Sequence, residues 1–294
     1  MAMNRRAFLE SCSLSAVATA LGGCASTWGE DSFYGPTIRD RLWMWGHHRD
    51  CTMTKAMPTW KGPSVDQAEG CRMMGIPNDC VIRWCNLPKH PWGDYFEQFR
   101  TLKRFSFGIT DGAAGSVWDK MKIAFEELQP RFPNLTGCFL DDYFIDDKLR
   151  QKKSDLVKIA DMVHAHALRL SVVLYSDQGG LKEGLREELD LCDEISFWFW
   201  KSANIHTMGD QVKRCRELIG PDKDLLLGLY MWDFSCGKPV PADCMETQLK
   251  FARQFLADHT VTGLIFHPSF AAALDVPAVS LSKEWIRAYG EDLW

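Results

Sequence analysis

Residues 135–144 are Leu-Thr-Gly-Cys-Phe-Leu-Asp-Asp-Tyr-Phe, a short run of mostly apolar residues that ends in two adjacent acids. The run does not alternate between apolar and polar residues. That pattern is typical of a strand buried on both faces, as in a parallel sheet covered by helices. The acids come where such a strand would leave the sheet. This stretch therefore indicates a class of fold and also the place where polar side chains would gather.

Seven further runs of the same character occur along the chain. Together the eight runs cover residues 42–46, 79–85, 104–110, 135–141, 169–176, 194–200, 224–232 and 262–267. Segments with apolar residues at helical spacing lie between most of them, at 64–75, 92–102, 116–128, 148–168, 181–191, 206–219, 242–259 and 280–289. Ser64 and Gly75 are candidates for the start and end of the first helix, and Ser280 and Ser282 are candidate caps of the last.

Strands that alternate with helices pair in parallel through right-handed crossovers. Eight such units in about 250 residues match an α/β fold of the (β/α)₈ TIM-barrel class, which we expect as a single domain over residues 41–294. An open, doubly wound sheet is the alternative. The sequence contains neither a Gly-x-Gly-x-x-Gly run after the first strand nor a P-loop run. The sequence therefore does not favour binding of a dinucleotide, or of a nucleotide through a P-loop.

The amino-acid composition indicates which kinds of molecule the protein is able to bind. Hydrophobic residues make up 46% and charged residues 25%, and the net charge is −5 at pH 7. Because there is no surplus of basic residues to neutralise phosphates, we expect no nucleic-acid partner. The chain has 12 Trp, 17 Phe and 6 Tyr. Such rings fill cores, and they also form platforms for the flat or apolar faces of a ligand.

The N-terminal segment has the features of an export signal. Arg5 and Arg6 precede a weakly apolar run at 11–20, and Leu-Gly-Gly-Cys follows at 21–24. The arginine pair resembles the twin-arginine signal of bacteria, and Leu-Gly-Gly-Cys resembles the lipobox of bacterial lipoproteins.

This resemblance implies a signal peptide over residues 1–23, a lipid attached at Cys24 and a tether over residues 24–40. The apolar run is too short to span a bilayer. We therefore expect an exported protein that is held to the bacterial cell envelope through its N-terminal lipid alone. Nine of the eleven cysteines lie outside Cys12 and Cys24, no Cys-x-x-Cys pair occurs, and no disulfide pairing follows from the sequence.

Polar and aromatic residues follow the predicted strands. Active sites of TIM barrels gather at the carboxyl ends of the strands, so we expect these residues to face one mouth. In strand order they are His47, Arg83, Asp111, then Asp141, Asp142 and Tyr143, then Asp177, Trp200, Lys201, Tyr230, Trp232, Asp233 and His267. Because side chains alternate along a strand, either residues 197 and 199 or residues 198 and 200 can face the barrel, but not both pairs.

The acids are candidates for a catalytic pair. Two carboxylates that flank a glycosidic bond can serve as acid and nucleophile, or as acid and base. Asp141 and Asp142 are consecutive, so on a regular strand they would point to opposite faces. The partner of either one is then expected from another strand, which makes Asp177 and Asp233 the candidates for the second catalytic carboxylate.

Three strand ends carry a likeness to a known group of proteins. They are Leu-Asp-Asp-Tyr-Phe after the fourth strand, Tyr-Met-Trp-Asp after the seventh and His-Pro after the eighth. Over residues 40–290 the chain resembles TIM-barrel glycoside hydrolases and related secreted lipoproteins. The resemblance implies a hydrolase acting on a carbohydrate substrate. Its substrate-binding residues would be His47, Arg83, Asp111, Tyr143, Trp200, Lys201, Tyr230, Trp232 and His267.

The sequence also departs from the large glycosidase groups. No Asn-Glu pair ends the fourth strand, no Glu ends the seventh, and the Asp-x-x-Asp-x-Asp-x-Glu run of chitinase-like barrels does not occur. A glycosidase with this sequence would use Asp where those families use Glu.

Two other functions fit the same residues. Although the glycosidase reading needs no cofactor, a metal-dependent hydrolase remains an alternative. The N and O ligands for a divalent ion would come from His47, His48, Asp141, Asp142, Asp177 and His267. The other alternative is a surface lipoprotein that binds glycans without cleaving them, since one fold can host both roles.

Overall fold

The computed structural model describes residues 33–54, 57–89, 91–110, 116–144, 152–176, 181 and 183–294. The chain divides into two units, Met1–Gly35 and Pro36–Trp294, and the helices and strands named below lie in the second. The predicted signal peptide and Cys24 lie outside the described residues, and so do Asp111 and Asp177.

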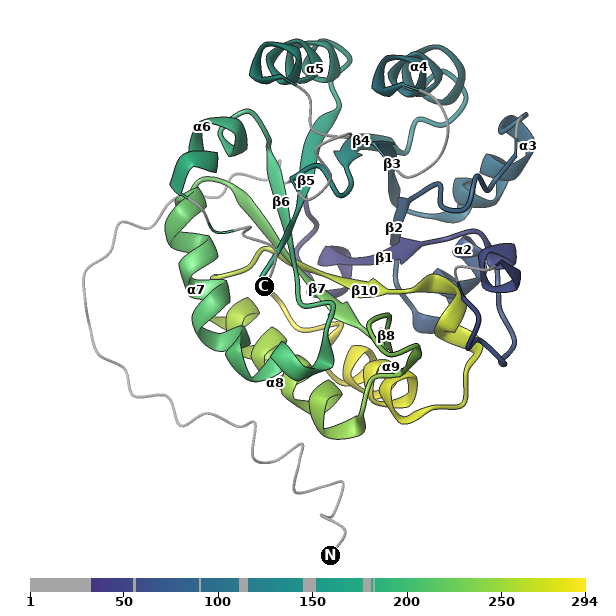
Figure 1. Cartoon of the computed structure of the whole chain (residues 1–294), viewed down its shortest axis with the longest axis vertical. Helices are drawn as coiled ribbons and strands as arrows, with labels where there is room; N and C mark the ends of the chain where they lie inside the picture. The colour runs from purple at the N-terminus through teal and green to yellow at the C-terminus, as the bar shows by residue number, and fades with distance from the viewer. Residues whose placement is uncertain are drawn as a thin grey trace, which may run out of the picture. The chain divides into compact units, whose positions relative to one another are not determined.

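Eight parallel strands close into a barrel, which confirms the predicted (β/α)₈ class (Figure 1). In chain order they are β1 (Leu42–Gly46), β2 (Asn78–Val81), β3 (Arg104–Thr110), β4 (Leu135–Leu140), β5 (Arg169–Tyr175), β6 (Glu194–Trp198), β7 (Asp224–Tyr230) and β10 (Gly263–His267). The barrel closes because β1 pairs with β2 on one side and with β10 on the other. All eight carboxyl ends therefore meet at one mouth.

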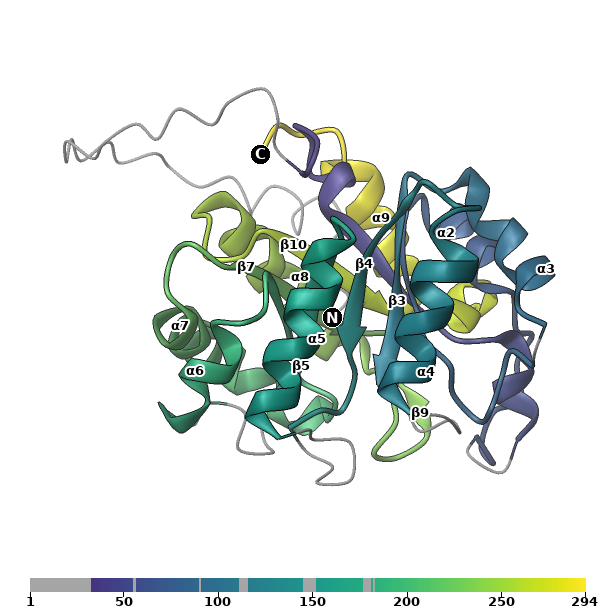
Figure 2. The same cartoon turned by 90° about the horizontal axis from the view of Figure 1, so that it is seen from above.

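Helices surround the barrel (Figure 1). They are α2 (Gln67–Met74), α3 (Gly93–Phe96), α4 (Val117–Lys122), α5 (Lys153–Ala165), α6 (Arg186–Leu189), α7 (Met208–Ile219), α8 (Ala242–Ala257) and α9 (Pro277–Tyr289). Figure 2 shows α4 and α5 running along the outside of the strands. None of the helices in the described part of the chain combines the length and hydropathy that a membrane span needs.

Short elements complete the loops. The 3₁₀ helices are η1 (Arg39–Arg41), η2 (Arg49–Met53), η3 (Glu97–Thr101), η5 (Glu183–Leu185), η6 (Ser202–Thr207) and η7 (Ser269–Ala273), and η4 (Ile123–Leu128) is a π-helix. Beyond β7, β8 (Trp232–Asp233) and β9 (Lys238–Pro239) form a small antiparallel hairpin. Figure 2 shows this hairpin at the end of the barrel to which the strand arrows point.

Several predicted boundaries were wrong. Helix α2 begins after Asp66 rather than at Ser64, although it ends at Gly75, whose φ of 71° suits glycine. Helix α9 begins at Pro277, because proline is favoured in the first helical turn. Ser282 lies inside that helix and donates to the carbonyl of Ala278 instead of capping it.

The second strand is shorter than predicted. It ends at Val81, whereas the apolar run suggested residues 79–85. Cys85 and Asn86 have φ values of 54° and 58°, which belong to a turn and not to a strand. Side chains after Val81 therefore do not alternate between the two faces of a strand. The turn, and not strand alternation, decides which of them reach the mouth.

Large rings fill the barrel below the mouth. The ring of Trp45 on β1 lies 4.8 Å from that of Phe139 and 5.1 Å from that of Trp198 on β6. Trp198 in turn lies directly on the backbone of Gly228 in β7, where a Cβ atom would overlap the indole. Position 228 must therefore lack a side chain if Trp198 is to keep its place.

We expect Gly228→Ala to lower the free energy of unfolding by about 1–3 kcal/mol, because the added methyl group displaces a fully packed indole. Thermal denaturation measures this loss as a fall in Tm. Gly184→Ala is the matched control, since nothing lies within 4 Å of a Cβ at that position. Equal Tm values for the two variants would contradict the packing described.

Candidate functional site

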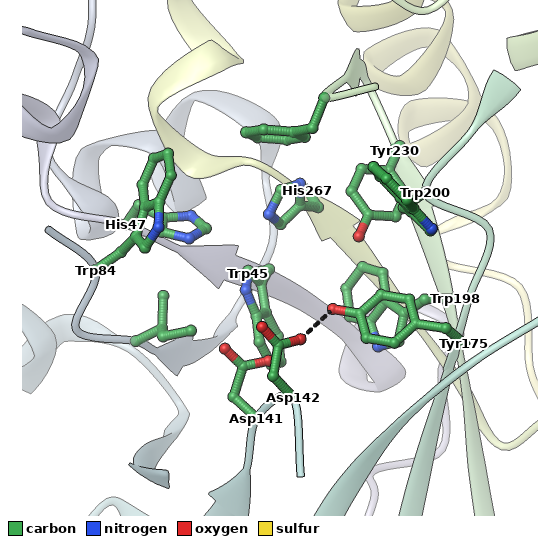
Figure 3. A pocket seen from close by; sticks show the side chains of 12 residues that line it. Trp45, His47, Trp84, Asp141, Asp142, Tyr175, Trp198, Trp200, Tyr230 and His267 are labelled. Atoms are coloured by element: carbon green, nitrogen blue, oxygen red, sulfur yellow. Dashed lines mark hydrogen bonds between the residues drawn. The ribbon is translucent and has the colours of Figure 1, made fainter. Parts of the chain in front are cut away.

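A pocket of about 270 Å³ opens at the mouth of the barrel (Figure 3). Its walls carry two carboxylates, two imidazoles and a majority of aromatic rings. The lining residues are Trp45, His47, Ile82, Trp84, Asp141, Asp142, Tyr175, Trp198, Trp200, Tyr230, Phe234 and His267. Segments far apart in the sequence meet here because the strands are parallel.

Strand alternation places most of the rings. Trp198 and Trp200 both line the pocket, whereas the rings of Phe197 and Phe199 contact each other 5.2 Å apart. The indole Nε1 of Trp198 donates to Ser196 Oγ at 2.9 Å, so its buried polar atom is satisfied. The orientation of this ring is thus fixed from two sides, by Ser196 and by Gly228.

Both acids after β4 project into the pocket (Figure 3). The prediction that they point to opposite faces was wrong, because β4 ends at Leu140 and the acids belong to a turn. Asp142 has a φ of 52°, which breaks the alternation of a strand. Thr110 from β3 holds the turn by donating from Oγ1 to the carbonyl of Asp141 at 2.8 Å.

Tyr175 at the end of β5 holds the second acid. Its hydroxyl donates to Oδ1 of Asp142 at 2.9 Å (Figure 3). Burial raises the pKa of Tyr175 well above its ordinary value, and the neighbouring Tyr230, Asp141 and Asp142 raise it further. The phenol therefore stays protonated and remains a hydrogen-bond donor to the carboxylate.

Two neutral histidines form the opposite wall. The rings of His47 and His267 lie 5.2 Å apart, and Nδ1 of each is buried without a hydrogen-bond partner among the described residues. Burial lowers the pKa of His47 to about 3. Burial and the neighbouring His47 also lower the pKa of His267 well below its ordinary value. Each ring is therefore uncharged, with one donor and one acceptor nitrogen, and because Nδ1 is buried, only Nε2 is left to meet a polar ligand.

The structure brings together six of the predicted site residues in this pocket: Asp141, Asp142, His47, Trp200, Tyr230 and His267. Lys201 lies at its edge, with Nζ 4.7 Å from the ring centroid of Trp200. Asp111 and Asp177 are outside the described residues, so their predicted roles stay predictions.

Four other predicted residues do not line the pocket. The guanidinium of Arg83 lies over Trp92 and donates to Asn86 at 3.1 Å. The ring of Tyr143 is fully buried, 5.0 Å from that of Phe144. Trp232 packs in an apolar cluster, with its ring 4.8 Å from that of Trp60.

Asp233 is the fourth, and it holds a loop together. Its carboxylate accepts from the backbone N–H of Ser202 at 2.9 Å and from the N–H and Oγ of Ser235 at 2.8 and 2.5 Å. Burial alone would raise the pKa of Asp233, but these hydrogen bonds outweigh burial and keep the pKa below its ordinary value. Its carboxylate oxygens therefore link η6, which follows β6, to the turn between β8 and β9.

The predicted site omitted Trp45, Ile82, Trp84, Tyr175, Trp198 and Phe234. Trp45 stands two residues before His47, and Tyr175 two residues before Asp177, so alternation along the strand could have identified both. Trp84 could not be found in this way. It follows the end of β2, where the backbone no longer alternates.

Of the residues proposed for a metal, His47, Asp141, Asp142 and His267 line the pocket, whereas Asp177 lies outside the described residues. His48 does not line the mouth; its Nδ1 accepts from the N–H of Asp50 at 3.1 Å, and its ring stacks 5.0 Å from that of Tyr95. Within the described ranges, no group of three or more His, Cys, Asp or Glu side chains is arranged to hold a metal ion.

The buried imidazole of His47 predicts a pH dependence of stability. The unfolded chain takes up a proton near pH 6.5, whereas the folded chain does so near pH 3. Stability should therefore be full above pH 6.5 and be lost as pH falls, by up to about 1.4 kcal/mol per pH unit for this group. Urea denaturation at several pH values between 7 and about 4.5 measures the slope, and His47→Gln should reduce it.

The buried Asp79 also contributes to the pH dependence of stability, but it does not affect the comparison of the wild type with His47→Gln. Burial raises the pKa of Asp79, which gives an opposite slope, but this contribution is common to both proteins. Parallel stability curves for the wild type and His47→Gln would mean that His47 is solvated and titrates normally.

No model of a known protein family matches this sequence, and no curated protein resembles it at a significant level. Solved structures do resemble its fold. An α-L-arabinofuranosidase from Thermotoga maritima, solved with arabinose, is 10% identical with a TM-score of 0.52, over 85% of this chain and 70% of that one. A protein assigned as an α-L-fucosidase from Bacteroides thetaiotaomicron is 10% identical with a TM-score of 0.54, over 88% and 98% of the two chains.

A third similar structure is a xylanase–α-amylase inhibitor protein in complex with trehalose. It is 13% identical with a TM-score of 0.52, over 85% of this chain and 98% of that one. At these identities the likeness concerns the fold. The chain is a single TIM-barrel domain that distantly resembles glycoside hydrolases and an inhibitor protein with the same architecture.

Proposed function

We propose that this protein is a glycoside hydrolase that binds its sugar at the mouth of the barrel and uses Asp141 and Asp142 as reacting carboxylates. The observation that carries the proposal is one pocket in which two carboxylates face a wall of aromatic rings (Figure 3). Glycoside hydrolysis needs a pair of carboxyl groups beside the scissile bond. Aromatic side chains provide the apolar surface against which a sugar ring can pack.

The walls suit the two kinds of surface on a sugar. Trp45, Trp84, Trp198 and Trp200 offer faces or edges to the C–H side of a ring. Nε2 of the neutral His47 and His267 rings would donate to or accept from a sugar hydroxyl group, according to which ring nitrogen carries the proton. A volume of about 270 Å³ is at the small end for ligand sites, which favours a single sugar unit in the pocket.

The two acids would have different roles. Tyr175 holds one oxygen of Asp142, which fixes the direction of its carboxylate and suits attack on the anomeric carbon or activation of a water. Asp141, only 8% exposed, would handle the proton of the glycosidic oxygen. Asp177 stays the alternative second carboxylate, because it follows Tyr175 by two residues.

A second candidate function is glycan binding without hydrolysis. The likeness to an inhibitor protein supports it, because that protein was solved in complex with the sugar trehalose although it is described as an inhibitor and not as an enzyme. The same pocket would then serve, and the two acids would accept hydrogen bonds from hydroxyl groups.

We expect Asp142→Asn to lower kcat on a cleaved glycoside by about 10²–10⁴-fold, because the reaction loses a charged carboxylate. Tyr175→Phe should cost about tenfold, since it removes one hydrogen bond to that carboxylate. A panel of aryl glycosides and polysaccharides, assayed for released reducing sugar, identifies the substrate first. Sugar binding by calorimetry is measured on the same variants.

Asp222→Asn is the matched control, because it makes the same chemical change at an exposed position. Binding of a glycan by the wild type with no cleavage of any member of the panel would favour the second function. Full activity of Asp142→Asn would refute the role assigned to Asp142.

We also propose that the chain is exported and anchored by a lipid on Cys24, which rests on the sequence of residues 1–24. The wild type is expressed in a bacterium that has twin-arginine export and lipoprotein processing. It should fractionate with membranes and incorporate radiolabelled palmitate. Cys24→Ser should be exported without label. Labelling of Cys24→Ser, or a soluble and unlabelled wild type, would contradict the anchor.

A further inference from the structure

Two cysteines meet between the loops that follow β1 and β2. Cys51 lies in η2 and is fully buried, whereas Cys85 lies in the turn after β2 and is partly exposed. The Cys85 side chain lies close enough to the buried Cys51 thiol to raise its pKa. They are far apart in the sequence, so the contact is a product of strand pairing between β1 and β2.

Further contacts hold the two sulfur atoms in place. The Cys51 thiol donates to the carbonyl of Trp84 at 3.3 Å, next to Cys85 in the chain. On the other side, Oγ1 of Thr54 lies 3.3 Å from Sγ of Cys85 and also donates to the carbonyl of Cys51 at 2.7 Å. Each loop thus contacts the cysteine of the other.

The remaining cysteines in the described part of the chain do not offer a comparable pair. Cys80 lies close enough to Cys71 to raise the pKa of that thiol, but both cysteines are buried. Cys138, Cys192 and Cys215 are buried as well. Cys85 combines a cysteine partner with partial exposure, so a dissolved oxidant can reach it.

We propose that Cys51 and Cys85 are a disulfide site, closed by exchange with a low-molecular-weight disulfide such as oxidised glutathione. The Cys85 thiol loses its proton, and its sulfur attacks the glutathione disulfide, which releases one glutathione thiolate. The Cys51 sulfur then attacks Sγ of Cys85 in the mixed disulfide and releases the second thiolate. The two protons of the cysteines end on two glutathione thiols, so two cysteines are oxidised and one glutathione disulfide is reduced.

The order of these steps follows from burial. Burial raises the pKa of Cys51 well above its ordinary value, and the adjacent Cys85 raises it further. Cys51 is therefore a poor first nucleophile, but the contacts between the two loops hold it near Cys85, so the second step is intramolecular. The partly exposed Cys85 is the thiol that meets the dissolved disulfide first.

The bond would stiffen one wall of the mouth. It joins the loop that begins at His47 to the turn that carries Trp84, whose rings lie 5.2 Å apart in the pocket. The proposal does not depend on hydrolysis, because the bond and its effect on stability are measured without any substrate.

The test uses the full-length protein treated with oxidised glutathione, then alkylated in denaturant without reductant and digested for mass spectrometry. We expect a cross-linked peptide that contains Cys51 and Cys85 and disappears on reduction. Oxidation should raise Tm by about 5 °C or more, because a long loop is closed in the unfolded chain. Cys85→Ser should give neither the cross-link nor the rise.

Cys244→Ser is the matched control, since Cys244 contacts the carbonyl of Ser202 elsewhere, and it should keep both effects. Because Cys51→Ser alters a buried position, Cys85→Ser carries the comparison, and its Tm before oxidation confirms that it folds. Alkylation of both Cys51 and Cys85 after treatment, or a glutathione adduct that persists on Cys85, would overturn the proposal.

Discussion

The closure of eight parallel strands is the constraint on which the mouth depends. Strand β1 pairs with β2 and with β10, so side chains from opposite ends of the sequence, such as His47 and His267, become neighbours. Large aromatic rings fill the interior of the closed barrel. Trp45 and Trp198 occupy it, and Trp198 does so because Gly228 leaves room for an indole on the backbone of β7. The floor of the pocket and the core of the barrel are thus the same set of side chains.

The turn after β4 brings two carboxylates, those of Asp141 and Asp142, to the mouth. A regular strand would have sent one acid inward and one outward. The left-handed conformation of Asp142 turns both toward the mouth, and Thr110 and Tyr175 from the two flanking strands hold the turn there. The opposite wall is neutral, since burial keeps His47 and His267 uncharged. A pocket with acids on one side and uncharged donors and rings on the others suits a neutral polyhydroxylated ligand better than an anion.

The sequence predicted the barrel well and the pocket in part. Continuous apolar runs are a strong signal for buried parallel strands, so most strands were placed to within two residues, and His47, Tyr230 and His267 could be assigned to the mouth. The failures came where local backbone departs from regular geometry. The early end of β2 moved Trp84 into the pocket and Arg83 out of it, and the turn at Asp142 reversed the expected direction of one acid. Asp233 was misleading for another reason: an acid after a strand can serve the backbone of a neighbouring loop, and only the contacts with Ser202 and Ser235 reveal this.

A crystal structure of the protein soaked with the sugar that it binds would locate the ligand. The proposed site predicts the sugar at the mouth, with its ring against the tryptophans and its anomeric carbon facing the carboxylates of Asp141 and Asp142. A sugar bound at another surface, or a mouth in which one of these two carboxylates points into the helix layer, would contradict it.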